Sequence, residues 1–127
     1  MKRIFPLFLA LFMLAGCAVP AVEASYRQIN MSEAQRMMES ETDYIILDVR
    51  TEAEFAEKHI PGAINVANET IGSEKIPELP DKDQLILVYC RSGNRSKQAA
   101  AKLAALGYTN IAEFGGINRW TGDIEME

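Results

Sequence analysis

The chain has 127 residues, which is room for one compact domain and little else. With 48% hydrophobic and 24% charged residues, its composition argues against a disordered chain. Its 18 acidic residues outnumber its 13 lysines and arginines, so the formal net charge is −5 and we expect no nucleic-acid partner. Two cysteines and one histidine do not suffice for a typical structural zinc site, and we predict no bound metal.

Residues 1–16 are predicted to be a signal peptide. Lys2 and Arg3 precede an uncharged run, residues 4–16, that is too short to span a bilayer as a mature helix. The run ends in Leu-Ala-Gly-Cys, which resembles the lipobox of bacterial lipoproteins. That resemblance implies cleavage before Cys17, acylation of its sulfur, and anchoring of the chain to a membrane through a tether, residues 17–25.

Cleavage before Cys17 would leave 111 residues (127 − 16), with the predicted domain at residues 26–127. We expect this domain on the periplasmic side of the cell envelope. Ala18 follows Cys17, which favours the outer membrane in a bacterium that has one. The alternative is an ordinary secretory signal cut after Ala24, which would leave a soluble periplasmic or secreted protein.

Two motifs predict helix starts in the first half of the domain. Ser-Glu-Ala-Gln at residues 32–35 fits a capping box and predicts a helix that ends near residue 40. Thr-Glu-Ala-Glu at residues 51–54 fits a second capping box, with a helix through residue 58. Residues 71–83 hold acids, lysines and prolines, which predicts a surface turn with one helical turn.

The remaining elements come from short apolar runs and one Ala-rich segment. Residues 96–106 predict a helix with Gly107 as its left-handed cap, and a short helix is expected at residues 118–121. Because strands alternate with helices, we predict an α/β fold, doubly wound, with a mostly parallel five-stranded sheet flanked by helices. The strands read directly from apolar runs are residues 44–49, 63–67, 85–89 and 110–114.

The polar loop between the strand at 85–89 and the helix at 96–106 is predicted to carry the chemistry. Cys90 stands at the carboxyl end of a buried strand, where open α/β sheets bind ligands. It also lies at a helix N-terminus, whose unpaired N–H groups favour negative charge. Gly93 allows the loop to curl so that N–H groups point inward. We therefore expect a lowered pKa for Cys90, with the thiolate as its major form.

We expect the backbone of this loop to hold an anionic sulfur. Arg91 and Arg95 are expected to bind an oxyanion, unless one of them is held in a structural ion pair. Asp48 and Arg50 are expected to tie the neighbouring strand end to the site, with a substrate role as the alternative. The predicted binding residues are Arg91, Ser92, Gly93, Asn94, Arg95 and Ser96.

Three motifs in order make the chain similar to a rhodanese-homology domain over about residues 26–122. Beside the Cys90 loop, they are Leu-Asp-Val-Arg at 47–50 with His-Ile-Pro-Gly-Ala-Ile-Asn at 59–65, and Leu-Gly-Tyr at 106–108 with Gly115-Gly116 and Trp120. The resemblance implies a doubly wound α/β domain that transfers sulfur through a cysteine persulfide, with no metal or organic cofactor. It places His59 in a structural turn.

Loop length favours sulfur chemistry over phosphate chemistry. Arg95 follows Cys90 by five positions, which matches the six-residue loop of the sulfurtransferases, whereas related phosphatases have one more residue. We therefore predict an enzyme that moves sulfane sulfur from a small anionic, thiosulfate-like donor to a thiophilic acceptor through a Cys90 persulfide. The alternatives are a sulfur-carrier or redox-sensing module without turnover, acting for an unidentified protein partner in the envelope, and a phosphatase or arsenate reductase.

Overall fold

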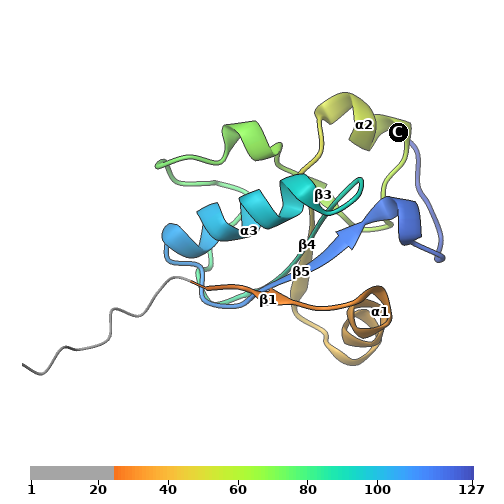
Figure 1. Cartoon of the computed structure of the whole chain (residues 1–127), viewed down its shortest axis with the longest axis horizontal. Helices are drawn as coiled ribbons and strands as arrows, with labels where there is room; N and C mark the ends of the chain where they lie inside the picture. Colours follow the sequence, from red (N-terminus) through yellow and green to blue (C-terminus); the bar gives the residue numbers. More distant parts are fainter. Residues whose placement is uncertain (1–24) are drawn as a thin grey trace, which may run out of the picture.

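The computed structural model describes residues 25–127 (Figure 1). The predicted signal peptide, the predicted lipidation site Cys17 and most of the tether lie outside the described residues. No helix of the described part is long and apolar enough to cross a bilayer. The elements in chain order are β1 (Arg27–Gln28), α1 (Met31–Ser40), β2 (Tyr44–Asp48), α2 (Glu52–Glu57), β3 (Ile64–Asn65), the 3-10 turn η1 (Asn68–Thr70), β4 (Leu85–Cys90), α3 (Asn94–Ala105), β5 (Ile111–Gly116) and the 3-10 turn η2 (Ile117–Arg119).

The five strands form one sheet in the order β1-β5-β4-β2-β3, and every neighbouring pair is parallel. The predicted α/β class is confirmed, and the sheet is parallel throughout. β4 lies at the centre, so its six residues are all buried. Its carboxyl end places Cys90 between the ends of β2 and β5, at the edge of the sheet where parallel strands present their loops.

Alternating side chains of β4 pack into two separate cores. Leu87 and Tyr89 belong to a core with α1, α2 and Phe114. Val88 and Cys90 face the other side, where the small side chains of α3 let that helix lie close to the sheet. Helices therefore cover both faces, with α1 and α3 on opposite sides in Figure 1. Cys90 belongs to the α3 face, so its sulfur lies directly over the N-terminal turn of that helix.

The capping prediction at α2 is confirmed and the one at α1 is wrong. Thr51 accepts a hydrogen bond from the Glu54 backbone N–H, and the Glu54 side chain accepts one from the Thr51 backbone. In α1 the cap is Asn30, whose side chain accepts from the Glu33 N–H at 2.8 Å. Because this helix begins at Met31, the side chain of Ser32 is already inside its first turn and cannot cap it.

Other differences concern short elements. β1 was not predicted, because two exposed residues carry no apolar signal and are held by pairing with β5. The charged residues of the segment at 71–83 are exposed, as expected for a surface turn. Its apolar residues Ile71, Ile76 and Leu79, however, are buried in the core between the sheet and α3. The helical turn near this segment precedes it, at η1.

Candidate active site

The Cys90 sulfur lies beneath the loop that joins β4 to α3. The residue is 1% exposed. The Gly93 N–H donates to Sγ at 3.0 Å, and the thiol lies 3.4 Å from Ser96 Oγ, to which it donates. The loop thus curls around the sulfur, so that Gly93 of the loop and Ser96 in the first turn of α3 contact the same atom.

Hydrogen bonding decides the ionisation of this thiol. Burial by itself would raise the pKa of Cys90, but the Ser96 hydroxyl and three backbone N–H groups of the loop and the first turn of α3 outweigh it. Those N–H groups belong to Ser96, Gly93 and Ser92. The net result is a pKa below the ordinary value of a thiol, which favours a negatively charged sulfur.

Two glycines allow the loop to close around the sulfur. Gly93 precedes α3 with φ of +111°, a backbone conformation that L side chains rarely adopt. Gly116, at the end of β5, pairs with Cys90 after a register shift in the β4–β5 ladder. A Cβ on Gly116 would overlap the Arg91 carbonyl and lie 2.5 Å from the Ser92 nitrogen. The strand and the loop can therefore approach this closely only where a side chain is missing.

The two arginines of the loop have different surroundings. Arg95 forms a bidentate ion pair with Glu54 of α2, with Nη1–Oε1 at 2.6 Å and Nη2–Oε2 at 3.0 Å. This is the structural ion pair that the sequence had left open as the role of one of the two arginines. Arg91 is exposed and lines a hollow of about 400 Å³ together with Arg50 and Lys58.

The Arg95–Glu54 pair predicts a pH-dependent contribution to stability. The hydrogen bond from Arg95 lowers the pKa of Glu54 from 4.5 to about 2. Because the folded-state value is the lower one, this contribution is present above the unfolded pKa and is lost as the pH falls toward about 2. Glu54→Gln, which preserves the capping pattern, should cost about 1 kcal/mol or less at neutral pH, since the pair is partly solvated.

Urea unfolding of both proteins at about pH 7 and about pH 3 measures this contribution. The stability difference between wild type and variant should shrink at the lower pH. An equal difference at both values would show that the charge of Glu54 is not what stabilises the fold.

Asp48 and Arg50 lie beside the site without reaching the sulfur. The Arg50 guanidinium donates to Asp48 Oδ2 at 2.7 Å and to the Lys58 carbonyl at 2.6 Å. The Asn65 side chain donates to the backbone carbonyls of both residues. These contacts tie the end of β2 to the end of α2 and to β3. His59 is also held structurally, since its ring stacks on Phe55 at 3.9 Å.

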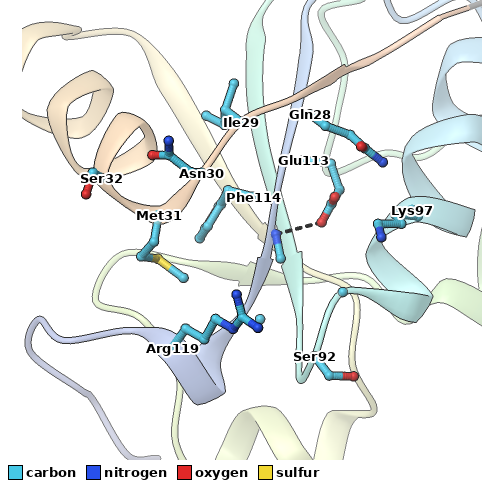
Figure 2. A pocket seen from close by; sticks show the side chains of 13 residues that line it. Gln28, Ile29, Asn30, Met31, Ser32, Ser92, Lys97, Glu113, Phe114 and Arg119 are labelled. Carbon is cyan, nitrogen blue, oxygen red and sulfur yellow. Dashed lines mark hydrogen bonds between the residues drawn. The ribbon is translucent and has the colours of Figure 1, made fainter.

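A second hollow, which we call the Lys97–Arg119 groove, borders the loop and has a volume of about 500 Å³. Ser92 and Gly93, which supply N–H groups to the sulfur, form part of its wall. The Arg119 side chain extends into this groove in Figure 2, with Lys97 on the α3 side. Two cations beside a cradle for an anionic sulfur suit the groove to a small anion.

Sequence reasoning missed three residues of this site. Arg119 was not considered, and Gly116 was noted only as part of a motif. Glu113 was passed over within the strand at 110–114, although a carboxylate inside an apolar strand is itself a signal. It is 2% exposed, lines the Lys97–Arg119 groove and accepts hydrogen bonds from Ser96 and Gly115.

The fold and the site define an α/β domain with a cysteine loop at the end of a central strand, and comparisons with known proteins agree with this description. Residues 30–123 match the family model of the rhodanese-like domain, and residues 1–18 match that of the prokaryotic membrane lipoprotein lipid attachment site. The chain belongs to the rhodanese-like domain family, a family of sulfurtransferases.

Individual relatives lie at moderate distance. The chain is 40% identical to a sulfurtransferase of Allochromatium vinosum over 70% of its own length and 81% of that protein. It is 34% identical to the thiosulfate sulfurtransferase PspE of Escherichia coli, over 63% and 73%. The solution structure of a rhodanese-like domain from Anabaena superposes with a TM-score of 0.72 at 25% identity, covering 81% of each chain. The chain spans only 24% of the adenylyltransferase and sulfurtransferase UBA4 of Candida albicans, which it also matches.

Proposed function

We propose that the protein is a sulfurtransferase that carries sulfane sulfur on Cys90, from a small thiosulfate-like anion to a thiophilic acceptor. The observation that carries this proposal is the cradle of N–H groups and one hydroxyl around a single buried thiol. Such a cradle stabilises negative charge on sulfur, which a thiolate and a terminal persulfide share. The name of the PspE relative supports thiosulfate as donor.

The proposed reaction has two displacements at sulfur. The Cys90 thiolate attacks the outer sulfur of thiosulfate, an S–S bond forms, and sulfite leaves with the electron pair of the broken bond. The new terminal sulfur carries the negative charge and is held by the N–H groups of the loop. An acceptor nucleophile then attacks that sulfur, and the Cys90 thiolate leaves in its original state.

The Lys97–Arg119 groove is the proposed route for the anionic donor. It adjoins the loop at Ser92 and Gly93, and its two cations outnumber the one carboxylate of its lining, Glu113, so that the groove can attract an incoming anion. Arg91, on the other side of the loop, is a second cation for this purpose. Arg95 supports the site through Glu54 instead, by fixing α2 against the start of α3.

A mass measurement tests the proposal. The full chain, incubated with thiosulfate and then freed of it, should gain the mass of one sulfur atom on the peptide that contains Cys90, and cyanide should remove it. No gain on that peptide would contradict the proposal. Loading without turnover above the rate of a free thiol would instead support the sulfur-carrier or sensor alternative.

We also propose that cleavage before Cys17 anchors the domain to the envelope, on the periplasmic face of the outer membrane where the cell has one. The match of residues 1–18 to the lipid attachment site supports the anchor. The mature protein should then begin at an acylated Cys17, and Cys17→Ala should no longer be acylated. Recovery of an unmodified chain that begins at Ser25 would contradict the anchor.

A further inference from the structure

Glu113 is a buried carboxylate that the proposed reaction does not use. It stands on β5 between two strands, next to β1 on one side and β4 on the other, and is 2% exposed. Burying a carboxylate is costly unless it is paired. Yet within residues 25–127 none of the ion pairs includes Glu113. Its carboxylate instead accepts two hydrogen bonds, from the Ser96 hydroxyl of α3 and from the Gly115 N–H of β5.

Those hydrogen bonds connect Glu113 to the sulfur through one hydroxyl. Glu113 Oε2 accepts from the Gly115 N–H at 2.6 Å, drawn as the dashed line in Figure 2. The same oxygen accepts from Ser96 Oγ at 2.7 Å, and Ser96 Oγ in turn accepts from the Cys90 thiol at 3.4 Å. The result is a continuous chain of thiol, hydroxyl and carboxylate.

The Ser96 hydroxyl has a single proton and cannot serve both ends of this chain at once. With Cys90 as a thiol, the proton points to Glu113. When the sulfur is negatively charged, it also attracts that proton. The Cys90 thiolate and the Glu113 carboxylate then compete for the one hydrogen bond that the Ser96 hydroxyl can donate. Other acceptors near the hydroxyl are backbone carbonyls, those of Gly93 and Gly115, which do not change charge.

We propose that Cys90 and Glu113 form a coupled acid pair bridged by the Ser96 hydroxyl, in which Glu113 is a positioning residue that sets the pH at which Cys90 becomes nucleophilic. The inference rests on the proposed function only in taking Cys90 as the nucleophile. A negative Glu113 disfavours a negative sulfur and competes with it for the Ser96 proton. The loop amides act in the opposite direction, so the carboxylate moderates the ionisation that they favour.

Such moderation has a chemical use. The nucleophilicity of a thiolate falls as its pKa falls, and the best attacking thiol ionises near the ambient pH. A thiolate that is always charged is also the form that oxidises most readily. A buried carboxylate beside the cradle keeps the sulfur reactive without keeping it permanently ionised.

The other charged groups around the pair are compensated or solvent-exposed. Glu54 and Arg95 neutralise each other, as do Asp48 and Arg50. The exposed cations Lys97 and Arg119 line the groove beside Glu113. On β1 the residue that pairs with Glu113 is the uncharged Gln28, and Arg91 of the loop lines the other hollow, with Arg50 and Lys58.

The test is the rate of Cys90 alkylation by iodoacetamide as a function of pH, followed on the Cys90 peptide of the full chain. Glu113→Gln removes the charge and keeps the size, so the midpoint should move down by about one pH unit or more. An unchanged or higher midpoint in the folded variant would overturn the proposal. Glu39→Gln, on an exposed position of α1, removes the same charge far along the chain and should leave the midpoint in place.

Ser96→Ala distinguishes a hydrogen-bonded bridge through the Ser96 hydroxyl from a direct effect of the Glu113 charge on the sulfur. With Glu113 present, the hydroxyl is shared with the carboxylate, so Ser96→Ala should raise the midpoint by a small amount. With Gln at residue 113, the hydroxyl is free to donate to the sulfur, and Ser96→Ala should raise the midpoint by a larger amount. Equal shifts in the two backgrounds would overturn the bridge.

A measurement on the wild type covers the case in which Glu113→Gln does not fold. In protein with carbon-13 in its glutamate carboxyl groups, the Glu113 resonance should show an inflection at the pH where Cys90 ionises. Alkylation of Cys90 should abolish that inflection, and a glutamate spectrum without one would overturn the coupling. Because neither assay needs a sulfur donor, failure here is distinct from failure of persulfide formation.

Discussion

Cys90→Ser is expected to abolish sulfur uptake and to lower thiosulfate turnover by about a thousand-fold or more. A serine hydroxyl ionises far above neutral pH and cannot carry a sulfane sulfur. The replacement is close in volume, and the Gly93 N–H and Ser96 hydroxyl remain as hydrogen-bond partners. Stability should therefore change by no more than about 1.5 kcal/mol.

Thiocyanate formation from thiosulfate and cyanide measures the effect, with urea unfolding as the control for the fold. A stably folded serine variant that retains wild-type turnover would show that the sulfur passes through another group. A variant that loses turnover only because it unfolds would leave its unfolding curve displaced, which separates the two cases.

Gly116→Ala is expected to remove activity by breaking the loop rather than by touching the sulfur. The added methyl group would overlap the Arg91 carbonyl, which is backbone and has no rotamer to change. Either β5 or the loop must move, and the N–H groups of Ser92 and Gly93 move with it. We expect a loss of about 1–3 kcal/mol or more in unfolding free energy, together with loss of most turnover.

Gly72→Ala is the matched control. An added Cβ at Gly72 meets nothing within 4 Å, and this glycine does not have a positive φ. Its stability should stay within about 0.5 kcal/mol of wild type or rise slightly. If Gly116→Ala behaved like Gly72→Ala in both assays, the close approach of β5 to the loop would have no role in holding the sulfur.

Local sequence patterns predicted the parts of the fold that depend on local chemistry. Apolar runs located four of the five strands, since a strand buried on both faces tolerates few polar residues. The Thr51–Glu54 capping box was readable because its two partners lie three residues apart on one turn. Asn30 took the cap that Ser32 was expected to provide, because the chain before α1 is fixed by pairing with β5.

Residues that act through distant partners could not be assigned in this way. The pairing of Arg95 with Glu54 joins positions 41 apart. The residues around the two arginines do not show that Arg95, and not Arg91, makes this ion pair. The link from Glu113 to Ser96 spans 17 positions and exists because β5 lies beside α3. β1 likewise has no signal of its own, because its two residues become a strand only against β5.

The sequence by itself determined the family, the parallel α/β sheet and the position of the sulfur. A buried strand, a cysteine, a six-residue polar loop and a helix leave little freedom in how those segments connect. Only the tertiary structure decided which groups share the sulfur's surroundings. Ionisation and hydrogen bonding depend on distances of about 3 Å between segments far apart in the chain, and such distances are set by packing.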